Sequence, residues 1–149
     1  QADYEAEMAR KKRIEQMTID YFQPGEMQPE RDHNFTGENS RVGERDNRKS
    51  RSVRNGWFSF DMEVPKGQPV GLVVDYWGGM RGSRTFDILG DGTQIATEDI
   101  SQMPDGKFVD VTYDIPNDLT LDKEQITVKF VPHQGNAAGP IYGVRTIKR

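Results

Sequence analysis

The sequence contains no cysteine, and this absence excludes several kinds of site. Without thiols the chain cannot form disulfides, thiolate metal centres or a cysteine nucleophile. Histidine is nearly as scarce, since only His33 and His133 occur. The chain also lacks the HExxH, GxSxG, P-loop and GxGxxG motifs of zinc proteases, α/β-hydrolases, nucleotide triphosphatases and dinucleotide-binding enzymes. The sequence therefore predicts no enzymatic constellation.

Long apolar runs are missing as well. No segment approaches the ~20 consecutive apolar residues of a transmembrane helix, and the opening QADYEAEMARKK lacks the apolar stretch of a signal peptide. The formal net charge of −4 argues against a general nucleic-acid binder. We therefore expect neither a membrane nor a nucleic acid as a partner, and we interpret the opening residues as a linker from a preceding segment.

What remains is a polar globular composition with a strong two-residue period. In WFSFDMEV, beginning at Trp57, apolar and polar residues alternate as in a half-buried β-strand. Seven such segments follow one another between Gly, Pro, Asn and Asp residues, and TIDYF at 18–22 adds an eighth. The pattern predicts an all-β protein, an antiparallel two-sheet β-sandwich or jelly roll. Residues 1–16 are predicted to be a linker helix, and 17–149 the sandwich.

The two faces of these strands predict which residues are buried. The inward positions predict this core: Phe58, Phe60, Ile88, Val109, Val111, Ile126, Val128 and Phe130. Carboxylates at the alternate positions, such as Asp61, Asp110 and Asp114, are expected on solvated sheet faces. Trp57 and Trp77 are either core residues or platforms for a sugar ring, and the core interpretation is favoured.

The segment DILGDG has two interpretations. Asp91 and Gly92 lie between two strand patterns and match the tight hairpin turn that needs positive φ angles. The same segment offers Asp87 and Asp91 as ligands for a structural calcium ion. The turn is the favoured interpretation, so we predict no cofactor and no metal site.

A long polar stretch, residues 31–56, separates TIDYF from the later strands. Its length without an evident strand predicts a loop that is ordered by packing or binding. If each strand crosses the sandwich once, this loop shares one end with the loops at 78–83, 101–106 and 134–140. The sequence therefore predicts a ligand-binding cluster at that end, formed by Asp32, His33, Asn34, Trp77, Arg81, His133 and Asn136. The alternative is that Asp32, His33 and Asn34 only tie the loop down through hydrogen bonds.

Four segments carry a resemblance to a known family: TIDYFQPGEMQPERDHNFTGENSRVGE, GWFSFDMEVP, VVDYWGGMRGSRTFDILGDGTQIAT and AGPIYGVR. They resemble the C-terminal β-sandwich domain of bacterial β-L-arabinofuranosidase-type glycoside hydrolases, over about residues 17–149. The resemblance implies a galactose-binding-like sandwich in a secreted or periplasmic enzyme of plant-glycan degradation. For such enzymes the resemblance implies catalysis by a cysteine nucleophile, with a zinc site and a glutamate, all in an (α/α)-barrel domain. This chain has no matching positions for them.

Two functions are therefore expected. The resemblance implies a non-catalytic accessory domain whose partner is the catalytic (α/α)-barrel domain of the same parent chain. The alternative is an independent carbohydrate-binding module. The chain has only two Trp and five Tyr residues, most of them at inward positions, and this scarcity favours packing over sugar binding.

Overall fold

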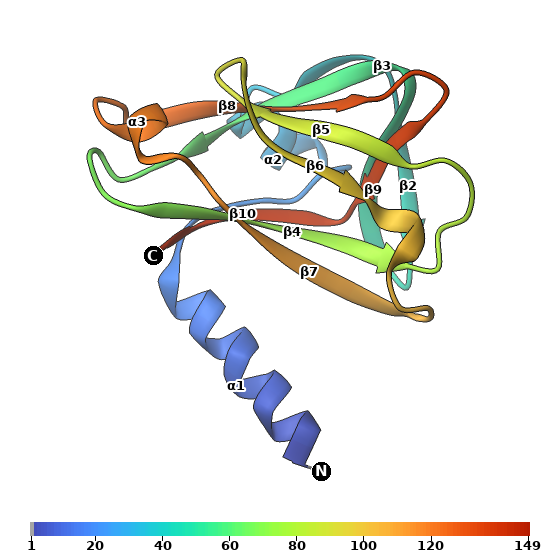
Figure 1. Cartoon of the computed structure of the whole chain (residues 1–149), viewed down its shortest axis with the longest axis horizontal. Coiled ribbons are helices and arrows are strands. Elements are labelled where there is room, and N and C mark those ends of the chain that lie inside the picture. The colour runs from blue at the N-terminus through green and yellow to red at the C-terminus, as the bar shows by residue number, and fades with distance from the viewer. Residues whose placement is uncertain (1) are drawn as a thin grey trace.

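Two antiparallel β-sheets, described by a computed structural model for residues 2–149, pack face to face around one apolar core (Figure 1). The four-stranded sheet has the order β1 (Thr18–Phe22), β10 (Gly143–Lys148), β4 (Val70–Gly78) and β7 (Lys107–Asp114). The six-stranded sheet has the order β2 (Thr36–Arg45), β3 (Arg48–Glu63), β8 (Gln125–Pro132), β5 (Thr85–Gly90) and β6 (Thr93–Asp99), with β9 (Ala137–Ile141) paired to β3. The predicted two-sheet sandwich is confirmed.

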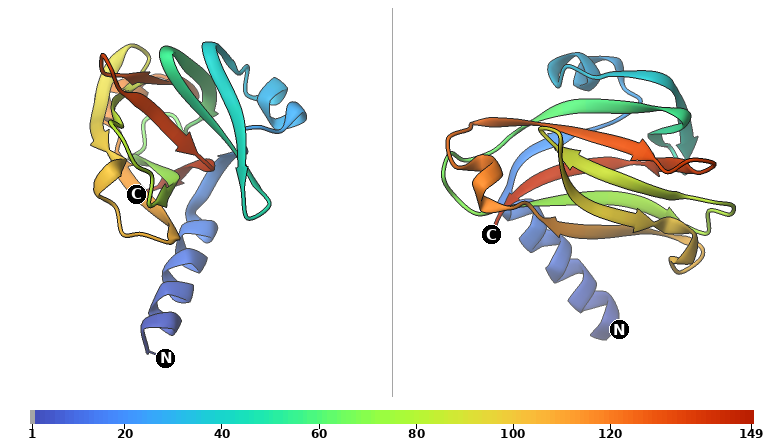
Figure 2. Two further views of the ribbon diagram at one scale, coloured as in Figure 1. Left: turned by 90° about the vertical axis from the view of Figure 1, so that its right-hand side faces the viewer. Right: turned by 45° about the horizontal axis from the view of Figure 1, so that its top comes forward.

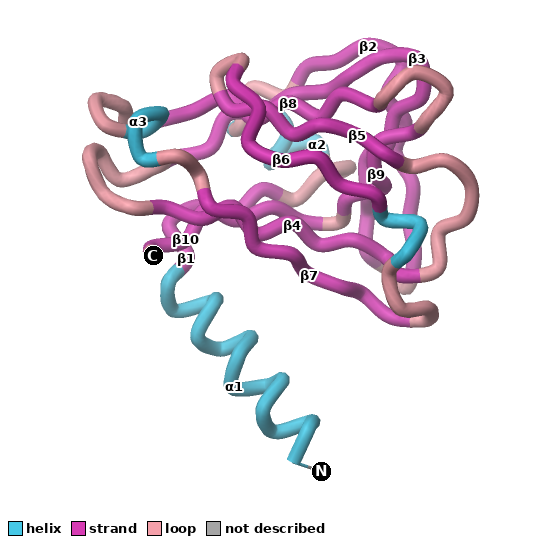
Figure 3. The backbone as a smooth tube through the Cα atoms, in the orientation of Figure 1, coloured by secondary structure: helices cyan, strands magenta, loops and turns pink. Residues whose placement is uncertain are grey.

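Helices are a minor part of the molecule (Figure 3). The predicted N-terminal helix is α1 (Ala2–Met17), which is largely exposed. Its N-terminal end projects away from the sandwich, and its C-terminal end lies next to it (Figure 2). Three short helical elements were not predicted: α2 (Met27–Asp32), α3 (Asn117–Thr120) and the 3₁₀ turn η1 (Ile100–Gln102). Each is too short for a helical period to be visible in its sequence. No helix in the described range is long and apolar enough to cross a membrane.

The core follows the predicted alternation in the central strands. Six of the eight predicted core residues are at most 1% exposed: Phe58, Phe60, Ile88, Ile126, Val128 and Phe130. Val109 and Val111 are only half-buried, because β7 is an edge strand with a neighbour on one side alone. Phenylalanine rings stack through the middle of the core, with centroids 4.4 Å apart for Phe22 and Phe60 and 5.2 Å apart for Phe58 and Phe130.

The polar stretch after residue 35 is a β-hairpin, so the prediction of a long loop was wrong. β2 and β3 pair up to Arg45 and Arg48, across a turn in which Asp46 and Asn47 have φ angles of 48° and 64°. Two positive φ angles are what a two-residue hairpin turn requires, and Asp and Asn tolerate them. The strand pattern was hidden because β2 is an edge strand with both faces exposed, so its residues do not alternate.

The predicted turn between β5 and β6 is confirmed. Asp91 and Gly92 have φ angles of 47° and 85°. The two aspartates that were considered as calcium ligands have protein partners instead: Asp87 bonds Thr97 and His133, and Asp91 accepts from the Thr127 N–H and bonds Lys123.

The predicted grouping of loops is confirmed for three loops. The Gly106 N–H donates to Gly78 O at 2.8 Å, and the Ala137 N–H donates to Ser83 O at 3.0 Å. These bonds hold the loops after β4, η1 and β8 together at one end of the sandwich. The last of these loops is shorter than predicted, because it leads into β9 at Ala137.

Candidate functional site

His33 is a structural residue by its contacts. Its Nδ1 lies 2.8 Å from Pro29 O and its Nε2 lies 3.1 Å from Asp20 Oδ1. The other carboxylate oxygen of Asp20 accepts from the Glu63 N–H at 2.9 Å. The pair therefore ties the segment after α2 to β1 and to the end of β3.

The neighbours of His33 have similar roles. Asn34 Nδ2 donates to Asp61 Oδ2 at 2.9 Å, and Asp32, which is exposed, accepts from Gln28. Arg51 Nε and Nη2 donate to the two carboxylate oxygens of Glu30, at 2.8 and 2.9 Å. The contacts of Glu30, His33 and Asn34 support the alternative in which this motif ties the chain down.

The other predicted site residues lie elsewhere. His133 Nε2 is 2.9 Å from Asp87 Oδ1, Asn136 Oδ1 accepts from the Thr85 N–H, and Arg81 is exposed in the loop after β4. Asn34 bonds the Asp61 carboxylate, and the Thr127 hydroxyl on β8 bonds the same carboxylate. Thr127 precedes His133 by six residues, which is a distance of ~20 Å along a strand at about 3.3 Å per residue. The predicted proximity of the two groups was therefore wrong, and the ligand-binding role of the seven residues stays a prediction.

Neither tryptophan belongs to the buried core. Both are half-buried, and each has a cation on its ring: Arg45 lies 4.6 Å from the Trp77 centroid and Lys129 lies 4.5 Å from that of Trp57. The favoured core interpretation was therefore wrong for both. The Arg45 contact also brings the tip of the β2–β3 hairpin against β4, so the polar stretch does reach Trp77, through a different residue from those predicted.

This hairpin contact closes one side of a pocket on the outer face of the four-stranded sheet. The pocket has a volume of about 400 Å³. It is lined by residues of α1 and of five strands: Lys11, Ile14, Glu15, Tyr21, Arg48, Val73, Asp75, Phe108, Asp110 and Arg145. We call it the sheet pocket.

Asp75 is the central acceptor of the sheet pocket. The alternation along β4 buries Val74 and Tyr76 in the core and turns Asp75 outward. Arg48 Nη2 donates to Asp75 Oδ2 at 2.9 Å. Burial raises the pKa of the Asp75 carboxyl above its usual value, and the bond from Arg48 offsets this only in part. Gly143 lies opposite Asp75 on β10 and leaves room for the Asp75 carboxylate, since a Cβ on Gly143 would lie 2.9 Å from Asp75 Oδ2.

Asp110 is the second carboxylate of the sheet pocket. It lies beside Asp75 in the register of β4 and β7, and Arg10 of α1 grips it with two bonds of 2.7 and 2.9 Å. Asp110 was expected on a solvated face, and α1 covers it instead. Because each carboxylate is held by its own arginine, the two are arranged as hydrogen-bond acceptors rather than as an acid and base pair.

Aromatic rings and a further arginine complete the sheet pocket. The Arg48 guanidinium lies 4.4 Å from the Phe108 ring centroid, and that of Arg145 lies 4.7 Å from the Tyr21 ring. Arg145 Nη1 donates to Thr18 Oγ1 at 3.1 Å. The pocket thus combines paired charges, an additional donor and apolar ring surface.

Sequence reasoning missed the sheet pocket, although β4 contained a signal. VGLVVDYW is a nearly continuous apolar strand, and Asp75 interrupts it at an outward position. A carboxylate in the middle of a buried strand costs free energy unless it is paired. That cost indicates a partner, but it does not identify Arg48.

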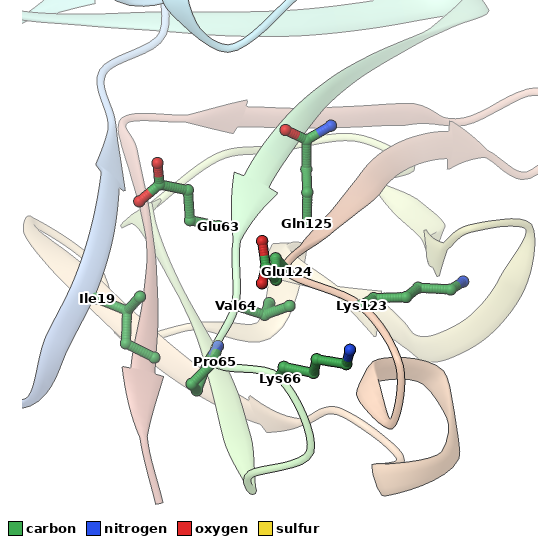
Figure 4. A pocket seen from close by; sticks show the side chains of 8 residues that line it. All are labelled: Ile19, Glu63, Val64, Pro65, Lys66, Lys123, Glu124 and Gln125. Carbon is green, nitrogen blue, oxygen red and sulfur yellow. The ribbon is translucent and has the colours of Figure 1, made fainter.

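A second, wider depression of about 800 Å³ lies between the β3–β4 loop and the beginning of β8 (Figure 4). The side chains of Lys66 and Lys123 extend to one side of it, away from Glu63. It has no aromatic lining residue, and Lys123 already bonds Asp91. In residues 2–149 no group of three or more His, Cys, Asp or Glu residues is placed to hold a metal ion. The sheet pocket is therefore the stronger candidate.

Solved structures share this fold. A family 35 carbohydrate-binding module from Clostridium thermocellum gives a TM-score of 0.65 at 14% identity, over 87% of this chain and 99% of that one. A family 35 module from an environmental isolate gives 0.64 at 12% identity, over 87% and 93%. An exo-β-1,3-galactanase from Phanerochaete chrysosporium gives 0.61 at 12% identity, over 85% of this chain and 28% of the enzyme. Such low identities show a common fold and nothing finer.

Sequence comparison assigns the chain to a family. No curated protein sequence matches it. A family profile matches residues 13–147, from the last turn but one of α1 to the last residue but one of β10. The chain belongs to this family, which is described as a family of unknown function, DUF6805.

Proposed function

We propose that this domain is a carbohydrate-binding module and that the sheet pocket holds the sugar. The observation that carries the proposal is the Arg48–Asp75 pair beside the Phe108 ring. A sugar presents hydroxyl groups at its edge and C–H groups on its face, so it needs charged or polar hydrogen-bond partners next to an apolar ring. The fold shared with carbohydrate-binding modules supports the proposal.

Five of the lining residues have a role in this proposal. Asp75 and Asp110 accept hydrogen bonds from hydroxyl groups, while Arg48 and Arg145 donate them. Phe108 supplies the apolar contact. Because both carboxylates are already ion-paired, the proposed role is binding without catalysis.

The parent protein in this proposal is a larger secreted or periplasmic glycoside hydrolase of plant-glycan degradation, of the β-L-arabinofuranosidase type. The galactanase is an example of this fold within a longer enzyme. The N-terminal helix favours such a context, because Tyr4 and Met8 on α1 are 65% and 49% exposed. Apolar side chains of this size on a projecting helix suit contact with a catalytic (α/α)-barrel domain. A sandwich that only packs on that domain is the second candidate function.

Calorimetric titration with soluble arabinan, galactan, xylan and mannan tests sugar binding. We expect saturable binding of at least one polymer, loss of binding in Asp75→Asn, and full binding in the control Asp114→Asn, which alters an exposed carboxylate on the same sheet. Absence of binding to all four polymers contradicts the proposal, and so does undiminished binding by Asp75→Asn.

The packing alternative has a separate test. If packing on the barrel is the function, the domain should co-elute with the separately purified catalytic domain, and Tyr4→Ala with Met8→Ala should abolish this. Sugar binding without co-elution supports the binding module alone. In either case the domain by itself should not hydrolyse aryl arabinofuranosides.

A further inference from the structure

The sheet pocket is closed at both ends of the strands that form its floor. Thr18 directly follows α1 and pairs with Ile147 of β10. Ile147 in turn pairs with Gly71, near the beginning of β4. The C-terminal end of α1 therefore lies near the beginning of β4, and Lys11, Ile14 and Glu15 of this helix line the pocket. The tip of the β2–β3 hairpin descends at the other end of the strand (Figure 1), where Arg48 reaches Asp75.

The pocket is also bounded across the strands on one side. β7 is the edge strand there, and Arg10 of α1 bridges to it by gripping Asp110 with both terminal nitrogens. The opposite edge is β1, where Tyr21 is 37% exposed. The pocket is therefore open at the β1 edge, beside Tyr21 and Arg145, and on the side that faces away from the sheet.

From this arrangement we infer that the sheet pocket takes the terminal sugar of a glycan chain and not an internal one. The inference rests on the proposed carbohydrate-binding function. An internal sugar is linked to a neighbouring sugar on both sides, so its binding site must be open at two ends. In the sheet pocket, α1 closes the end near the beginning of β4 and Arg48 closes the end near the end of β4. The volume of about 400 Å³ is near the lower end of the ~300–1,000 Å³ range of small-molecule pockets.

Binding stoichiometry per gram of polymer tests the inference. Soluble arabinan, galactan and xylan are titrated calorimetrically before and after limited endo-hydrolysis, which multiplies chain ends without changing total sugar mass. If the pocket takes chain ends, the number of binding sites per gram should rise in proportion to the number of ends. An unchanged number of sites per gram for a polymer that binds overturns the inference and leaves the proposed function standing. No binding before or after hydrolysis overturns both.

A matched pair of variants tests the wall formed by α1. Arg10→Ala removes the grip on Asp110, and Arg13→Ala removes an exposed arginine of the same helix. We expect Arg10→Ala to gain binding sites on the intact polymer, while Arg13→Ala behaves as the unaltered protein. Circular dichroism confirms that both variants keep their fold. Equal site numbers for folded Arg10→Ala and the unaltered protein, on the same intact polymer, contradict the role of α1 as a wall.

Discussion

The Arg48 guanidinium, on the six-stranded sheet, donates to the Asp75 carboxylate, on the four-stranded sheet, with Nη2 2.9 Å from Oδ2, although the two residues are 27 positions apart in the sequence. Arg48 directly follows the Asp46–Asn47 turn, so the hairpin tip carries it past the edge of its own sheet. Together with the contact of Arg45 with Trp77, this bond holds the tip against β4, and it also supplies a donor to the sheet pocket. The hairpin is therefore both a wall of the pocket and a part of its chemistry.

Asp75→Asn should abolish sugar binding without lowering stability. The pKa of Asp75 is raised by burial, so above that pKa the ionised carboxylate is less favourable in the folded than in the unfolded chain. At pH 7 the variant should therefore show the same or a higher urea midpoint, and this gain should vanish as the pH falls towards the ordinary Asp value of about 3.9. A clearly lower midpoint at pH 7 would contradict the argument.

Glu30→Gln should destabilise the fold in a pH-dependent way. Burial works to raise the pKa of Glu30, but hydrogen bonds from Arg51 and the Gly25 N–H outweigh it and leave the pKa below its usual value. The ionised carboxylate therefore stabilises the folded state above the unfolded-state pKa, and this contribution is lost as the pH falls through the folded-state pKa. We expect a loss of about 1–3 kcal/mol in the free energy of unfolding at pH 7.

Urea denaturation of Glu30→Gln and the unaltered protein at pH 7 and pH 3 checks this expectation. The difference in free energy of unfolding should shrink at pH 3. A difference that stays constant would show that the ionised Glu30–Arg51 pair is not its cause.

His33→Ala should lower stability and leave sugar binding intact. The change removes the imidazole bonds to Asp20 Oδ1 and Pro29 O, while Asp20 keeps the Glu63 N–H and Pro29 O keeps the backbone N–H of residue 33, so the loss should be about 0.5–1.5 kcal/mol. Asp32→Ala is the matched control, since Asp32 is exposed and its carboxylate accepts from Gln28 of the same short helix, so its loss should leave the melting temperature unchanged. Weakened glycan binding by His33→Ala at unchanged melting temperature would instead support the predicted ligand role of this residue.

Phe60→Ala should be among the most damaging changes in the chain. Phe60 is fully buried and stacks on Phe22, so its truncation should cost about 3–5 kcal/mol by chemical denaturation. Val109→Ala, on the half-buried edge strand β7, should cost clearly less. Equal losses for the two variants would contradict the assignment of the core.

Much of the sandwich could be predicted from local pattern. The alternation in WFSFDMEV depends only on which residues are neighbours along the chain, so it correctly assigned Phe58 and Phe60 to the core. The Asp91–Gly92 turn was recognisable for the same reason, because its positive φ angles are a property of two adjacent residues. Strand parity correctly grouped three of the end loops.

The tertiary structure decided what local pattern does not encode. β2 is exposed on both faces, so nothing in its sequence alternates and only its pairing with β3 makes it a strand. The separation of His33 from His133 depends on strand register. The sheet pocket depends on how α1 and the hairpin tip fold over the four-stranded sheet. Arg48 and Asp75 meet only because the two sheets pack together, and no periodicity along the chain records a contact made across 27 residues.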